Sequence, residues 1–146
     1  MDNSNGSFTD DSLEITFNGS KTINEIDVIT RQDNLNNPIE PTLAQTFSLY
    51  GITAFDVQYL DGGNWVNVQD GSVTGNNKVW RQFTFPAITT SKIKVVVHGS
   101  ADSAFSRIVE VEAWTPGATS TATNFALASI NSCFSSVVTQ STAQCQ

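Results

Sequence analysis

The sequence predicts an all-β fold, a sandwich of antiparallel strands, and three observations support this prediction. Only 14% of the residues are charged, and Asn, Thr and Ser fill the polar positions, a mixture typical of strands rather than of helices. Short stretches of alternating polar and apolar residues recur along the chain with turn residues between them. Residues 54–68, AFDVQYLDGGNWVNV, place a DGG turn between two such stretches, which is the local pattern of a β-hairpin.

The predicted strands follow one another at short intervals. They span residues 13–17, 22–31, 46–51 continuing into 54–60, 64–69, 79–85, 92–98 and 108–114. Alternation is clearest in three of them, because residues two apart share one face of a strand. The apolar faces that we expect to form the core carry Phe55, Val57 and Tyr59, then Ile93, Val95 and Val97, then Val109, Val111 and Ala113.

Antiparallel strands place their connections at alternate ends of a sandwich. If residues 46–60 form one bent strand, the short turns 18–21, 61–63 and 86–91 lie at one end. The long loops 32–45, 70–78 and 99–105 then lie together at the other end. Long loops gathered on a rigid scaffold are the usual place for binding, so we expect the ligand site there.

The last part of the chain differs in composition from the rest. Residues 1–114 read as one β-sandwich domain, whereas residues 115–146 contain no charged residue and are rich in Ser, Thr and Ala. The composition predicts a flexible tail. Alternatively, residues 124–129, NFALAS, add a strand at an exposed sheet edge. Cys133 and Cys145 either close a small local loop or stay reduced.

Charge and hydropathy exclude several kinds of partner. The net charge is -7, with seven Lys and Arg residues, whereas nucleic acids and anionic membranes are held mainly by basic side chains. No apolar run reaches the roughly 18 residues of a membrane span. The first residues, MDNSNGSFTDD, are acidic and polar, unlike a signal peptide.

Catalysis is not predicted. His98 is the only histidine, and it stands on the outward face of a strand end with no sign of a nucleophile and an orienting group beside it. We expect at most a contact at the loop rim. Glu110 and Glu112 lie about 7 Å apart along one strand face, a spacing that an inverting glycosidase uses. A pair of acids on a solvated strand face is the interpretation that we favour.

Sugar recognition needs an aromatic face with amides, carboxylates and guanidinium groups around it. The long-loop end offers these groups. The predicted carbohydrate-binding residues are Arg31, Gln32, Asp33, Asn34, Glu40, Asn77, Trp80, Phe105 and Arg107. Trp80 is the expected stacking aromatic because it faces away from Phe83 and Phe85; the alternative is that it packs in a second layer of the sandwich. Trp65 and Trp114 are assigned to the core.

The order of DSLEITF, KTINEIDVITRQDN, AFDVQYLDGGNWVNV, WRQFTF, SKIKVVV and SRIVEVEAW resembles the discoidin domain, also called the coagulation-factor type C domain. It is especially similar to bacterial family 32 carbohydrate-binding modules. The resemblance runs from about residue 11 to residue 114 and implies a galactose-binding-like jelly roll. Relative to that family the first strand is missing, and we expect residues 124–129 to supply it, in a circular permutation or by donation to a neighbouring copy.

The resemblance also implies a function. We expect a noncatalytic module that binds galactose-like or related glycans, in an extracellular or cell-surface setting as part of a larger protein. It further implies a structural calcium ion with Glu110 as a ligand from the last strand, although Ca²⁺ takes roughly six to eight oxygen ligands and the early loop that would supply others is missing. The alternative function is a structural or adhesive repeat that self-associates through the tail by strand exchange.

Overall fold

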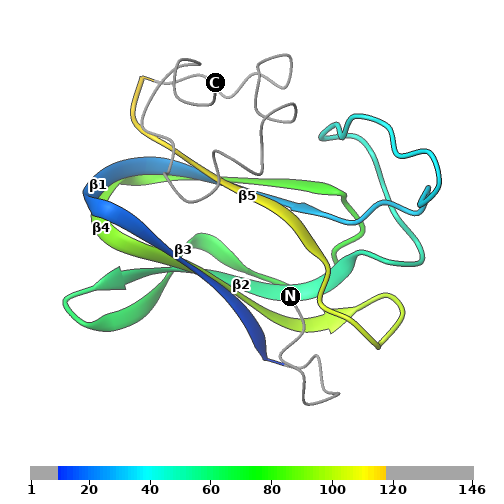
Figure 1. Ribbon diagram of the computed structural model, residues 1–146. Helices are drawn as coiled ribbons and strands as arrows, with labels where there is room; N and C mark the ends of the chain where they lie inside the picture. Colours follow the sequence, from blue (N-terminus) through cyan, green and yellow to red (C-terminus); the bar gives the residue numbers. More distant parts are fainter. Residues whose placement is uncertain (1–9, 118–146) are drawn as a thin grey trace.

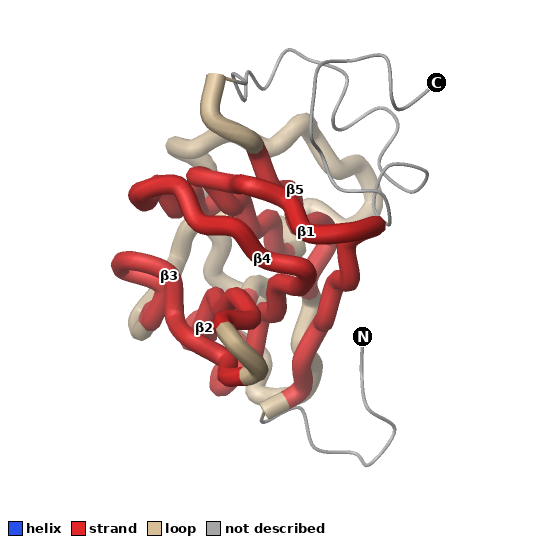
Figure 2. The backbone as a smooth tube through the Cα atoms, turned by 90° about the vertical axis from the view of Figure 1, so that its left-hand side faces the viewer, coloured by secondary structure: helices blue, strands red, loops and turns tan. Residues whose placement is uncertain are grey.

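The computed structural model describes residues 10–117, and these form strands and loops without a helix (Figure 2). The strands are β1 (Asp11–Thr30), β2 (Ile52–Asp61), β3 (Asn64–Val73), β4 (Trp80–Ser100) and β5 (Ile108–Trp114). They pair antiparallel in one sheet of order β3-β2-β4-β1-β5. This confirms the predicted fold class. The described residues include no helix long and apolar enough to cross a membrane.

Two long strands turn this one sheet into a sandwich. The predicted strands 13–17 and 22–31 are joined in β1, and 79–85 and 92–98 are joined in β4. The pairing of β1 with β4 is irregular between Thr16 and Lys21, and Gly19 has a φ of 79°, which a residue without Cβ adopts at no steric cost. Both strands bend near this point, so that one layer holds β4, β1 and β5 and the other holds β3, β2 and the remaining halves of β4 and β1 (Figure 1).

The main core lies between the two layers. It contains the inward residues that alternation predicts on β2 and β4, together with Val111 and Ala113 of β5. Phe55 of β2 meets Phe83 of β4 edge to face, with ring centroids 6.1 Å apart, a favourable aromatic geometry. Trp65 was assigned to the core but is only half-buried. Its ring lies on the β3 side of the hairpin with the Lys94 ammonium 4.1 Å from its centre.

The predicted hairpin is present. Asp61 pairs with Asn64, and the two residues between them, Gly62 and Gly63, have φ values of 56° and 91°. Positive φ at both central positions is the requirement of a tight hairpin turn, which glycine meets without strain. The DGG sequence therefore fixes the register of β2 against β3.

The predicted strand 46–51 is wrong. β2 begins at Ile52, and the preceding residues make only an isolated bridge, Thr46 to Lys78. Here the chain folds inward so that the Phe47 ring enters a second, smaller cluster with Ile29, Val79 and Trp80. A Cβ on Gly51 would lie 2.3 Å from that ring, so only glycine fits.

The long loops do gather at one end. Thr90 Oγ1 donates to the Leu60 carbonyl (2.8 Å) at the hairpin end. At the opposite end, Phe47 N donates to Asn77 O and Ala101 N donates to Gly51 O, both at 2.9 Å. The cyan 31–51 loop and the yellow-green 101–107 loop lie side by side there, on the right of Figure 1. Residues 124–129, Cys133 and Cys145 lie outside the described residues, so the predictions made for them remain predictions.

We predict that Gly51→Ala destabilises the domain by about 1–3 kcal/mol, because the added methyl group overlaps the Phe47 ring and overpacking costs about that much. Urea denaturation measures the loss. The control is the same substitution in a Phe47→Ala background, where the clash is gone and Gly51→Ala should cost much less. Equal costs in both backgrounds would contradict the steric explanation.

Candidate functional site

The loop end is built around the buried hydroxyl of Thr30, the last residue of β1. Its Oγ1 donates to the Arg107 carbonyl (2.8 Å) and accepts the Ile52 N–H (2.9 Å). The Asn76 amide donates to Ile52 O at 2.9 Å. One short network thus joins the end of β1, the start of β2 and the loop between β3 and β4 to the loop before β5, because each buried backbone group needs a partner.

The 31–51 loop is held in shape by two side chains that were predicted to bind sugar. The buried Gln32 amide pairs with both backbone groups of Ile39, donating to its carbonyl (2.7 Å) and accepting its N–H (3.0 Å). The Asp33 carboxylate accepts the N–H groups of Ser48 (2.7 Å) and Leu49 (2.9 Å). These polar groups of Gln32 and Asp33 are therefore hydrogen-bonded within the loop itself.

An aromatic and guanidinium surface lies beside this loop. The Arg107 guanidinium is 4.6 Å from the centre of the Phe105 ring and 5.4 Å from that of Tyr50. Phe105 is 46% exposed, so part of its ring is open to a ligand. We call Tyr50, Phe105 and Arg107 the aromatic platform. Sequence reasoning identified Phe105 and Arg107 but missed Tyr50, which its place directly before Gly51 at the loop end could have indicated.

Asp102 holds the guanidinium of the platform in place. Its carboxylate forms an ion pair with Arg107 and also accepts hydrogen bonds from Ser100 Oγ and the Ala104 N–H. Burial works to raise the pKa of Asp102, but these hydrogen bonds, led by the one from Arg107, outweigh it and lower the pKa to about 2. The pair stays charged at any ordinary pH, which fixes the orientation of Arg107.

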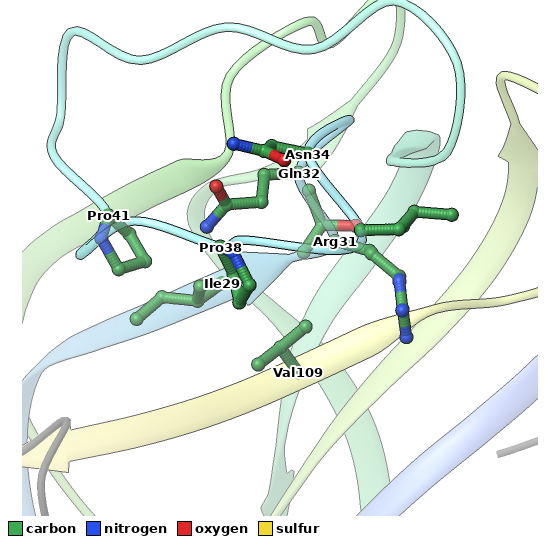
Figure 3. A pocket seen from close by; sticks show the side chains of 9 residues that line it. Ile29, Arg31, Gln32, Asn34, Pro38, Pro41 and Val109 are labelled. Atoms are coloured by element: carbon green, nitrogen blue, oxygen red, sulfur yellow. The ribbon is translucent and has the colours of Figure 1, made fainter.

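A pocket of about 210 Å³ opens under the first part of the 31–51 loop, on the outer face of β1 and β5 (Figure 3). We call it the β5 pocket. Its lining residues are Ile29, Thr30, Arg31, Gln32, Asn34, Leu35, Pro38, Pro41 and Val109. Three predicted residues, Arg31, Gln32 and Asn34, therefore come together here.

Trp80 corrects the prediction of a stacking aromatic. Its side chain is only 5% exposed and packs with Ile29, Phe47 and Val79 beneath the 31–51 loop. The sequence placed it on the correct face of β4, but that face is covered at this end, as in the alternative of a second packed layer. Of the other predicted residues, Glu40 and Asn77 are exposed. His98 bonds to Asp10 (2.8 Å) and Asp56 (3.0 Å) on the outer face of the other layer.

The interpretation of Glu110 and Glu112 as a solvated pair is also wrong. They are 3% and 7% exposed, and Asp27, which pairs with Glu112 in the sheet, is completely buried. Among residues 10–117, both oxygens of Asp27 and Oε2 of Glu110 have no hydrogen-bond partner. The Trp114 indole N–H donates to Glu112 Oε2 at 3.3 Å, and the indole groups of Trp80 and Trp114 oppose the rise in the pKa of Asp27.

Burial controls the protonation of these acids. Loss of hydration, followed by repulsion from Glu25 and Glu112, raises the pKa of Asp27 to about 8. Burial likewise raises the pKa of Glu110 and of Glu112, and their mutual repulsion adds to the rise for Glu110. Within residues 10–117 no three His, Cys, Asp or Glu side chains are placed to hold a metal ion. Burial favours the protonated forms of Asp27 and Glu110, and the calcium site expected at Glu110 stays a prediction.

The fold is that of a known group of binding modules. The chain is 19% identical to the family 32 carbohydrate-binding module of Streptococcus pneumoniae EndoD, covering 71% of this chain and 68% of that one with a TM-score of 0.54. Module CBM32-2 of a GH31 protein, bound to GalNAc, is 17% identical over 77% of this chain and 69% of that one, with a TM-score of 0.55. Chitosan-binding module 2 of a Paenibacillus sp. IK-5 chitosanase/glucanase, bound to chitotriose, is 17% identical over 73% of this chain and 72% of that one, with a TM-score of 0.53.

No family model and no curated protein matches the chain. At these identities the solved structures establish the fold. The chain therefore has the discoidin-like, galactose-binding-like β-sandwich of family 32 carbohydrate-binding modules, as its sequence resemblance implies.

We predict that the domain becomes less stable as pH rises from 5 to 9. A carboxyl whose pKa is raised by folding stabilises the native state most below its unfolded pKa, and that contribution is lost as pH approaches the folded value, about 8 for Asp27. Thermal unfolding across this range measures the trend. Asp27→Asn should flatten it and raise the melting temperature at pH 9 by several degrees, on the order of 1 kcal/mol.

Asp70→Asn is the matched control, because Asp70 is exposed and has a φ of 57° that Asn tolerates equally well. It should leave the pH dependence unchanged. A wild-type stability that rises toward pH 9 would contradict the assignment of buried, protonated acids.

Proposed function

We propose that this domain is a noncatalytic glycan-binding module whose ligand lies on the aromatic platform. The observation that carries the proposal is Phe105, an exposed ring whose neighbouring guanidinium is already fixed by Asp102. Fixed donors beside an apolar face match a sugar, which offers C–H groups on one side and hydroxyl groups at its edge. Little ordering of side chains remains to be paid for when the sugar binds.

Galactose-like sugars are the ligands that we propose. Their axial 4-hydroxyl leaves one ring face with a continuous run of C–H groups, which suits the open part of Phe105. Arg107 then lies at the edge of the sugar, where its remaining N–H groups donate to hydroxyl oxygens. Solved modules of the same fold bind GalNAc and chitotriose, which supports a glycan ligand in general.

The acids of the domain support binding rather than hydrolysis. Glycosidases place two carboxyl groups on either side of an accessible bond, whereas Glu110 and Glu112 are buried. His98 is occupied by Asp10 and Asp56. We also propose an extracellular or cell-surface setting within a larger protein, where an appended module brings its neighbours to a glycan.

Self-association is the second candidate, and the sheet order favours it. Among the described residues β5 pairs only with β1, which leaves its outer edge available for strand addition. Residues 115–146 are the proposed source of the added strand. Light scattering on the full chain tests this: an oligomer that becomes a monomer when residues 115–146 are deleted supports strand exchange, and a monomer throughout contradicts it.

We predict that Phe105→Ala weakens binding of a galactoside about tenfold, because loss of an aromatic stacking face costs on the order of 1–1.5 kcal/mol. A glycan array identifies the galactoside, and isothermal titration measures its affinity. Val66→Ala is the control, since Val66 is a similarly exposed apolar residue on β3, 38% exposed and remote from the loops. Unchanged affinity after Phe105→Ala would reject the platform as the binding surface.

A further inference from the structure

The β5 pocket has a floor made by a bulge in the last strand. Ile29 pairs with Glu110, but the next residue of β1, Thr30, pairs with Ile108. Val109 is the extra residue between them, so it leaves the alternation that should point it into the main core. It is 50% exposed and lies against Pro38 and Ile29 in Figure 3. Bulges commonly redirect a side chain at a functional position.

The roof of the pocket is held in place without a ligand. The Gln32 amide fixes both backbone groups of Ile39, and Asn34 Oδ1 accepts the Asn37 N–H at 3.3 Å. Pro38 and Pro41 restrict the backbone between and after these contacts. A loop that is tied at several points keeps the pocket open, so a ligand need not create it.

The walls of the pocket are mainly apolar. Ile29, Leu35, Pro38, Pro41 and Val109 supply aliphatic surface. The polar groups on the lining are largely used, since the Gln32 amide is bonded to Ile39 and the Thr30 hydroxyl is bonded to Ile52 and Arg107. A hydroxyl group buried here would lose its hydration without gaining a partner. The part of a ligand that packs against these walls is therefore aliphatic, such as the methyl end of an acyl group.

The mouth of the pocket carries a free positive charge. Arg31 is exposed and extends past Val109 in Figure 3. Arg107 forms an ion pair with Asp102, and Arg81 donates a hydrogen bond to Asn76 and lies over the Phe83 ring. Within residues 10–117, Arg31 makes no contact of these kinds. Glu40 does not line the pocket. An arginine fork without a partner favours a carboxylate, which it can bind through two hydrogen bonds.

We infer that the β5 pocket binds an N-acylated acidic sugar, with the acyl group between Leu35, Pro38 and Val109 and the carboxylate on Arg31. This rests on the proposed glycan-binding function and names a sugar class for a second subsite outside the aromatic platform. A neutral, hydroxyl-rich sugar leaves Arg31 unpaired and its own hydroxyls unsatisfied in the pocket. A ligand with both an aliphatic acyl group and an anion satisfies both parts.

Four methyl glycosides separate the two contributions. N-acetylneuraminic acid carries both groups, glucuronic acid only the carboxylate, N-acetylgalactosamine only the acyl group, and galactose neither. Each is titrated into the ¹⁵N-labelled full chain by NMR. Followed by the amide signals of Arg31, Leu35 and Val109, which report the pocket and not the platform, N-acetylneuraminic acid should bind about tenfold more tightly than either single-group sugar.

Two substitutions divide the affinity further. Arg31→Gln should weaken binding of the two acidic sugars about tenfold and leave N-acetylgalactosamine unchanged. Val109→Ser should weaken the two N-acyl sugars and leave glucuronic acid unchanged. Lys21→Gln removes the same charge at the bend of β1, away from the loops, and should have no effect.

The outcomes also separate this inference from the proposed function. Suppose that galactoside binding depends on Phe105. If N-acetylneuraminic acid then binds no more tightly than the single-group sugars, or if Arg31→Gln weakens its binding no more than Lys21→Gln does, the pocket assignment is wrong and the platform stands. If N-acetylneuraminic acid shifts Arg31 and Val109 while Phe105→Ala changes nothing, the pocket stands and the platform is wrong. Absence of N-acetylneuraminic acid binding overturns the inference.

Discussion

The pairing of β1 with β4 continues through both layers of the sandwich, and the other strands and the loop end take their positions from it. β2 adds to one half of β4 and β5 adds to one half of β1. Because both long strands bend at the same place, their inward side chains close over a single core. Thr30 and Trp80, the residues at one end of this pairing, then carry the loops that form the candidate site.

The loop end shows how a long loop becomes a binding surface. Gln32 and Asp33 form hydrogen bonds to the backbone of the 31–51 loop, so they hold the loop in the shape that forms the site. Arg107 is fixed by Asp102 and two rings, whereas Arg31, at the mouth of a pocket, has no ion pair within the described part of the chain. The surface thus offers two kinds of binding group. The platform presents aromatic rings with a fixed guanidinium, and the β5 pocket presents apolar walls with a cationic side chain at its mouth.

The buried acids place a cost on the same layer. Asp27, Glu110 and Glu112 share one face of neighbouring strands, and a buried carboxylate is expensive unless it is paired or protonated. Burial raises the pKa of all three acids, which links the stability of this layer to pH.

The sequence by itself determined the strands other than 46–51, the DGG turn and the end at which the long loops meet, because alternation and turn chemistry act over a few neighbouring residues. It also indicated Phe105 and Arg107, whose residue types suit a sugar. Only the tertiary structure decided the joining of strands into β1 and β4, the inward turn of Phe47, and the burial of Trp80 and Glu110. It also decided that Val109 leaves the core at a bulge. Burial and bulges depend on which segments pack together from distant parts of the chain, and alternation within one strand carries no information about what covers its outer face.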